Sequence, residues 1–119
     1  NSEEDILSIA EEMPYLKSCQ GVKAEKTACL LQKIYTYVEY PKEAKNEGLE
    51  GLVVLQFVVE KSGEIAQIKV VKSAGSSLDK AALDALTKLQ DGGNIWSPGM
   101  QDGKAVNVRY NLPIRFKLD

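Results

Sequence analysis

The sequence predicts an α+β domain over residues 39–119, a two-layer sandwich of a three-stranded antiparallel sheet and two helices, after a partly helical extension over residues 1–38. From Val106 to Leu118 every second residue is apolar, and polar residues and Pro113 alternate with them. This pattern is typical of an antiparallel strand with one face in water. Between residues 78 and 89 the apolar residues recur at helical spacing instead, which predicts a helix that packs on the sheet.

Two earlier strands complete the predicted sheet. Leu52–Glu60 is apolar on both faces, which favours a central strand that is covered on both sides. A polar turn containing Gly63 follows, and Ile65–Lys72 is predicted as the returning strand of a hairpin. Ile68 and Val70 are expected to point toward the core.

Local signals place the helices. A helix with an apolar face between residues 29 and 38 cannot continue past Tyr40, because Pro41 disfavours the helical conformation of its predecessor. A short second helix is predicted from Pro41 to Glu47, with Gly48 as its left-handed cap. Ser76 is predicted as the N-cap of the helix over residues 76–90. The apolar residues between Ile6 and Met13 fit a helix or a short strand equally well.

The two cysteines, Cys19 and Cys29, leave two interpretations open. One is a disulfide, which would stabilise the domain and indicate an oxidising compartment such as the periplasm or the cell exterior. The other is a pair of reduced thiols that act as small buried apolar side chains. Their spacing is not that of a redox-active Cys-x-x-Cys pair.

Composition excludes several classes of function. Fifteen basic and 17 acidic side chains give a net charge of −2, which argues against nucleic-acid binding. The chain has no histidine, so we expect no enzyme activity, no metal site and no cofactor. No apolar run approaches the roughly 20 residues that cross a bilayer. The acidic segment Asn1–Asp5 is unlike the start of a signal peptide.

The final strand is the strongest candidate for a functional surface. Pro113 cannot donate to a β-ladder, so we expect the strand to bend there and to lie at the edge of the sheet over part of its length. An edge strand can pair with an extended peptide from another chain. The alternative is that Arg109, Arg115 and Lys117 only protect the edge against aggregation.

A series of motifs resembles one known family. In the family's order and spacing, over roughly two-thirds of the chain, the sequence contains Tyr40-Pro41-Lys42-Glu43-Ala44, Gly48, Gly51, Val53–Val59, Ser62-Gly63-Glu64-Ile65, Ser73-Ala74-Gly75, Leu78–Ala82, Trp96-Ser97-Pro98-Gly99, Gly103–Val106 and Leu112–Phe116. Together these segments resemble the TonB C-terminal domain. Residues 91–95 depart from the family pattern by an additional Gly-Gly pair.

The resemblance implies a periplasmic, non-catalytic domain of an energy transducer that is anchored in the inner membrane and works with ExbB and ExbD. It implies that the domain binds the TonB box, an extended peptide of an outer-membrane receptor, as an added strand. Carried over to this chain, the expected binding residues on the last strand are Ala105, Val106, Asn107, Val108, Arg109, Tyr110, Asn111 and Leu112. The expected approach segment contributes Tyr37, Tyr40 and Pro41.

Three other functions remain open from the sequence. The same fold could serve as a sensory or interaction domain of a signalling protein. Alternatively, two copies could pair their edge strands and form a homodimer. A small hydrolase has little support, because the chain lacks histidine and a nucleophile motif.

Overall fold

The computed structural model describes residues 6–91, 93 and 95–118, so residues 1–5 of the predicted extension and residue 119 lie outside the described residues. The helices are α1 (Lys23–Tyr37), α2 (Lys42–Asn46) and α3 (Ser76–Gln90). The strands are β1 (Ile6–Leu7), β2 (Tyr15–Leu16), β3 (Gly51–Val59), β4 (Ile65–Lys72), β5 (Trp96–Ser97), β6 (Gly99–Gln101) and β7 (Lys104–Phe116). No helix of the described part is both long and apolar enough to span a membrane.

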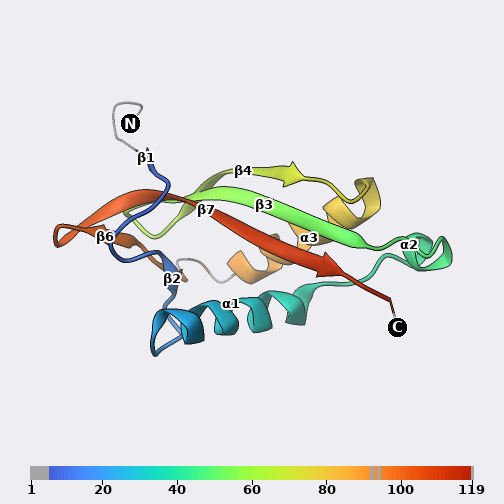
Figure 1. Ribbon diagram of the computed structural model, residues 1–119, viewed down its shortest axis with the longest axis horizontal. Coiled ribbons are helices and arrows are strands. Elements are labelled where there is room, and N and C mark those ends of the chain that lie inside the picture. The colour runs from blue at the N-terminus through green and yellow to red at the C-terminus, as the bar shows by residue number, and fades with distance from the viewer. Residues whose placement is uncertain (1–5, 92, 94, 119) are drawn as a thin grey trace.

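The fold is α+β, as predicted, with helices packed against a curved sheet (Figure 1). The predicted number of three strands is wrong. The described residues form a five-stranded sheet in the order β1-β7-β3-β4, with β6 also paired to β7. A separate pair joins β2 to β5. The additional strands have two or three residues each, too short for an alternating pattern to show in the sequence.

The three long strands hold the positions that the sequence predicts. β3 is central, antiparallel to β4 on one side and to β7 on the other. Its register with β7 is unbroken from Gly51↔Phe116 to Val59↔Val108 and passes through Pro113. The bend that we expect at Pro113 therefore does not interrupt the pairing, because the missing N–H lies on the side of β7 that does not pair with β3.

The core lies between the sheet and the helices. α3 packs on β3, and α1 packs against α3. Val53, Leu55, Phe57 and Val59 point from β3 into this core and are fully buried. Trp96, which follows α3, is fully buried as well and lies against Phe57 with 5.5 Å between ring centroids.

One inward residue was assigned wrongly from the sequence. Ile68 is 44% exposed, although Val70 packs against the core as predicted. The register between β3 and β4 shifts between Gln56↔Lys69 and Val58↔Ala66, and Gln67 adopts a positive φ of 54°. A β-bulge here adds one residue to β4, so the side-chain alternation changes faces within the strand.

The predicted cap of α3 is also displaced. Gly75, and not Ser76, is the N-cap, with a φ of 114° that favours glycine. The Asp79 carboxylate accepts hydrogen bonds from the Ala74 backbone N–H and the Ser73 hydroxyl, which closes the turn before the helix. Gly48 caps α2 in the left-handed conformation, as expected, with a φ of 66°.

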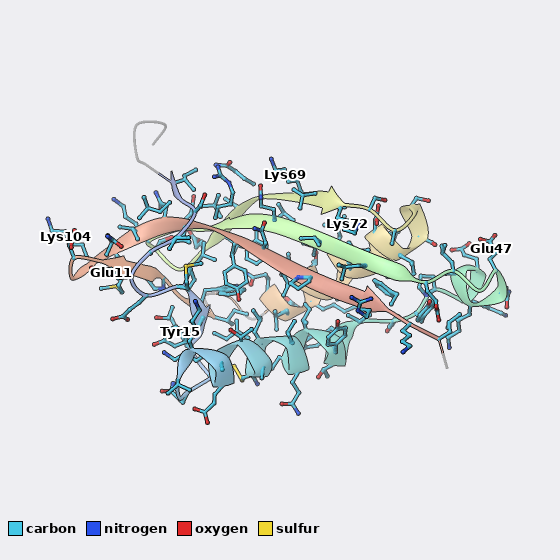
Figure 2. All side chains as sticks on the ribbon, viewed as in Figure 1. Glu11, Tyr15, Glu47, Lys69, Lys72 and Lys104 are labelled. Carbon is cyan, nitrogen blue, oxygen red and sulfur yellow. A yellow bond between two sulfur atoms is a disulfide. The ribbon has the colours of Figure 1, made fainter. Side chains whose placement is uncertain are left out.

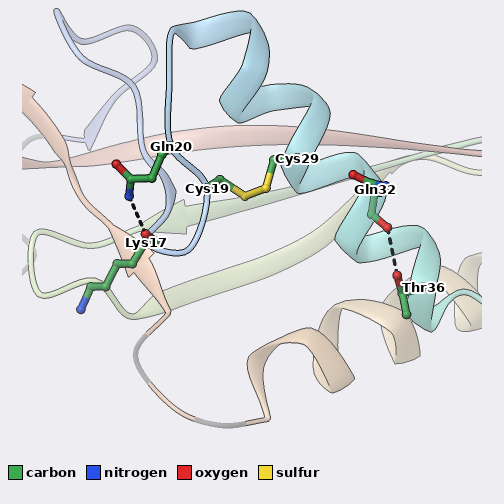
Figure 3. Close-up of a disulfide and its surroundings, with 6 residues drawn as sticks. All are labelled: Lys17, Cys19, Gln20, Cys29, Gln32 and Thr36. Carbon is green, nitrogen blue, oxygen red and sulfur yellow. Dashed lines mark hydrogen bonds between the residues drawn. A yellow bond between two sulfur atoms is a disulfide. The ribbon is translucent and has the colours of Figure 1, made fainter.

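The N-terminal extension is tied to the body of the domain in two ways. β2 pairs with β5, and Cys19 forms a disulfide with Cys29 on α1 (Figure 3). Cys19 is almost fully buried in the same core cluster as Leu16, Leu30 and Ile34. The disulfide interpretation is therefore confirmed, and the extension is part of the folded core rather than an appendage.

Candidate functional site

The side of β7 that faces away from β3 is the candidate site. In an antiparallel pair, successive residues direct their backbone groups alternately toward and away from the partner strand. Pro113 has no N–H, and the Arg115 N–H donates to the Tyr35 hydroxyl on α1 rather than to β3. These two residues fix the alternation: Arg109, Asn111, Pro113 and Arg115 direct their backbone groups toward the outer edge. Figure 1 shows α1 running along that side of β7.

Part of the outer edge is already paired within the chain. β1 lies parallel to β7, with Ile6 opposite Asn107 and Leu7 opposite Val108. A parallel bridge at Val108 engages the backbone of its neighbours, so pairing with β1 extends to Arg109. Beyond Arg109, the described part of the chain has no further strand on this edge. The outer edge thus has no partner strand from Asn111 onward, and the Tyr35 hydroxyl covers it at Arg115.

A groove of about 680 Å³ adjoins this stretch of β7. Arg109, Tyr110 and Asn111 line one wall, and the segment from Ser8 to Tyr15 lines another. The first turns of α1, including Lys26 and Leu30, form the third wall. Figure 2 shows Glu11 and Tyr15 at this end of the molecule, close to the β6–β7 hairpin whose tip carries Lys104.

Aromatic packing supports the wall of the groove that contains Tyr110. Tyr110 stacks on Phe57 at 5.7 Å and contacts Trp96 at the same centroid distance. Burial raises the pKa of the Tyr110 hydroxyl, so this side chain stays neutral at physiological pH. On the opposite wall, the Lys26 ammonium lies 3.7 Å from the centre of the Tyr15 ring, a cation–π contact. The groove therefore offers a firm aromatic surface beside an open strand edge.

The eight predicted binding residues of β7 do not share one environment. Ala105 and Val106 pair with β6, and Asn107 and Val108 pair with β1. Leu112 points into the core and is buried. The residues that combine a wall of the groove with the outer edge of β7 are Arg109, Tyr110 and Asn111.

The predicted approach segment lies elsewhere. Tyr37, Tyr40 and Pro41 line a separate pocket near α2 and α3. Tyr40 packs edge-on against Phe116, at the far end of β7, and its hydroxyl donates to the Leu49 carbonyl. Desolvation, and secondarily the Glu50 carboxylate, raises the pKa of this hydroxyl. The structure thus places this segment at the opposite end of β7 from the groove.

The Tyr35 hydroxyl covers the outer edge of β7 at Arg115. Replacing Tyr35 with phenylalanine removes the acceptor of the Arg115 N–H, 2.8 Å away, and opens the outer edge at that residue. We expect the free energy of unfolding to fall by about 0.5–1.5 kcal/mol and the Arg115 amide to exchange faster with solvent. Urea denaturation and amide hydrogen exchange measure these effects.

Tyr37→Phe is the matched control for that substitution. Tyr37 is as exposed as Tyr35, at 40% against 41%, and its hydroxyl has no hydrogen bond to any described residue. The control should leave both measurements unchanged. Equal effects of the two substitutions would show that the Tyr35 hydroxyl does not hold the edge.

Within the described ranges, no group of three or more acidic or cysteine side chains is arranged to hold a metal ion. Arg109, Lys26 and the nearby glutamates are exposed or half-buried. The distinctive property of the site is its open backbone.

Comparisons with known proteins agree with this description. A family model described as "Gram-negative bacterial TonB protein C-terminal" matches residues 36–118. The chain is 33% identical over 101 residues to Protein TonB of Vibrio cholerae, covering 84% of this chain and 38% of that protein. It is 41% identical over 82 residues to Protein TonB of Helicobacter pylori, covering 59% of this chain and 29% of that protein.

A solved structure is similar as well. The solution NMR structure of Helicobacter pylori TonB-CTD superimposes with a TM-score of 0.60 at 28% identity, covering 83% of this chain and 86% of that one. The chain spans between about a quarter and two-fifths of the length of the curated relatives that it matches. The chain belongs to the family of Gram-negative bacterial TonB protein C-terminal domains.

Proposed function

We propose that this domain binds an extended peptide as an added strand on the outer edge of β7, within residues 105–112. The observation that carries the proposal is the open edge beyond Arg109, next to the groove lined by Tyr110 and Asn111. Main-chain hydrogen bonds to the edge would supply affinity, and the groove would receive side chains of the guest. Family membership supports the TonB box of an outer-membrane receptor as the guest.

The intact protein would then be an energy transducer that supports transport across the outer membrane. In this proposal a segment outside the present chain anchors the protein in the inner membrane and contacts ExbB and ExbD, and the domain works in the periplasm. The Cys19–Cys29 disulfide supports an oxidising compartment. The relatives that share the domain are TonB proteins roughly three times longer than the stretch they match.

The expected binding is weak and reversible. A peptide that forms about four main-chain hydrogen bonds gains roughly 0.5–1.5 kcal/mol from each. Association and ordering of the peptide consume much of that gain. A contact of this strength can form and break repeatedly, which suits a domain that transmits force in cycles.

Asn111→Pro tests the proposal. The substitution removes the backbone N–H that Asn111 directs to the open edge, without removing a backbone group that bonds to β3. We expect a TonB-box peptide to bind roughly threefold to tenfold more weakly, the equivalent of one hydrogen bond. Isothermal titration calorimetry measures the dissociation constant.

Asn111→Ala is the control, because it keeps the backbone N–H and removes the side chain that accepts a hydrogen bond from Gln56. The alanine variant should bind more tightly than the proline variant, and denaturation curves show whether both variants remain folded. Equal binding by the proline variant, the alanine variant and the parent would contradict strand addition at this edge. The alternative is that two copies of the chain pair their edge strands. Sedimentation without peptide tests it, because a dimer of the parent that dissociates in the Asn111→Pro variant would favour self-pairing.

A further inference from the structure

We infer that β1 is a built-in competitor of the guest peptide: in the free domain it occupies the start of the strand edge that the peptide needs. The inference rests on the proposed function and adds regulation to it. The occupant is a segment of the same chain, Ile6–Leu7, and the contested backbone groups belong to Asn107 and Arg109, on either side of Val108.

The competition follows from the geometry of the ladder. β7 has two edges, and β3 occupies one of them from Val108 to Phe116. β1 pairs on the other edge, at Asn107 and Val108, inside the stretch proposed to receive the guest. Each outward N–H and C=O group pairs with one strand at a time. A guest that uses the edge from Asn107 onward must therefore displace β1.

The contacts of β1 suit it to reversible release. It has two paired residues, and both side chains are only half-buried. Ile9, two residues after the end of β1, is 81% exposed, so the chain is loosely held immediately after the strand. A two-residue strand with so few buried contacts opens at a much lower free energy than the core of the domain.

The chain from Glu12 onward is firmly anchored, so release of β1 does not require unfolding of the domain. Glu12 exchanges two backbone hydrogen bonds with Met100, at 3.0 and 2.8 Å. β2 then pairs with β5, and the disulfide holds Cys19 to α1. The residues between Leu7 and Glu12 also form a wall of the groove. Movement of β1 away from β7 would lengthen the open edge and shift that part of the wall, while β2, α1 and β7 keep the rest of the groove in place.

The size of the effect follows from the fraction of molecules in which β1 is released. The apparent dissociation constant equals the intrinsic one divided by that fraction. If about one molecule in ten has β1 released, its permanent removal tightens binding roughly tenfold. The effect appears in peptide affinity, whereas the folded core stays unchanged.

The test uses two variants that remove β1 in different ways, Leu7→Pro and a deletion of residues 1–7. We expect each to bind the TonB-box peptide several-fold to roughly tenfold more tightly than the parent. In the absence of peptide, the amides of Asn107 and Arg109 should lose protection against hydrogen exchange. Val71→Ala, which changes an exposed residue of β4 outside the groove, should bind like the parent.

The outcomes separate this inference from the proposed function. If all the proteins bind the peptide with equal affinity, β1 does not compete, and strand addition still stands. If neither the parent nor the variants bind it, the proposed function and the inference both fall. The indole signal of the buried Trp96 shows that each variant is folded. Retained protection of Asn107 and Arg109 in the deletion variant would also overturn the inference.

Discussion

Replacing Trp96 with alanine is expected to lower the free energy of unfolding by about 3–5 kcal/mol, the range for truncating a large buried aromatic side chain. Trp96 is fully buried and contacts both Phe57 and Tyr110. Its indole N–H also donates to the Gln90 side chain, so truncation leaves that acceptor without its partner. The loss is a large part of the total of 5–15 kcal/mol that is typical of small domains.

Urea denaturation followed by far-UV circular dichroism measures this loss without relying on tryptophan fluorescence. Val71→Ala is the control, because Val71 is a sheet residue with 47% exposure. Its stability should change by no more than about 0.5 kcal/mol. A Trp96→Ala variant as stable as the control would mean that the indole is not part of the core.

Removal of the disulfide by Cys19→Ser and Cys29→Ser is expected to cost about 2–3 kcal/mol. The bond closes a loop with a sequence separation of 10, and the chain-entropy estimate for such a loop is of this size. The buried position of Cys19 adds to the cost, since a serine hydroxyl there loses its contact with water. Thermal unfolding with and without a reducing agent measures the effect.

The double serine variant also serves as the control for unspecific effects of the reducing agent on the parent. Reduction should destabilise the parent and leave the variant unchanged. The pairing of β7 with β3 should be unchanged, because the disulfide joins the extension to α1 and does not touch β7. If reduction leaves the melting temperature of the parent unchanged, the bridge does not stabilise the native chain.

The sequence predicts the long elements of this fold correctly for physical reasons. β7 alternates because one of its faces covers the core, and β3 is apolar throughout because it is central. The helical spacing in α3 reflects its packing on β3. Pro113 correctly indicates an edge, since its missing N–H faces away from β3.

Features that depend on tertiary contact could not be predicted in the same way. β1 is a strand only because β7 offers it an edge, and the two residues have no periodicity of their own. The bulge that exposes Ile68 depends on the positive φ of Gln67, which glutamine rarely adopts. The displaced cap of α3 reflects a choice between two adjacent turn residues, Gly75 and Ser76.

The candidate site, too, could be predicted only in part from the sequence. The edge of β7 follows from its sequence, and the resemblance to TonB domains indicated which residues to consider. The groove is assembled from three distant parts of the chain, namely Ser8–Tyr15, the start of α1 and Arg109–Asn111, and no local pattern connects them. The separation of Tyr40 from that groove likewise follows from its packing on Phe116.

Amide chemical shifts during titration with a TonB-box peptide test strand addition most directly. If the peptide adds to the outer edge of β7, the amide signals of Arg109, Tyr110 and Asn111 shift. The Asn111 amide also becomes protected against hydrogen exchange, because its N–H gains a partner. Signals near Tyr40 and Pro41 should change much less, because that pocket lies at the other end of β7. Saturating peptide that leaves residues 105–112 unmoved, or that shifts only residues around Tyr40, would contradict the account.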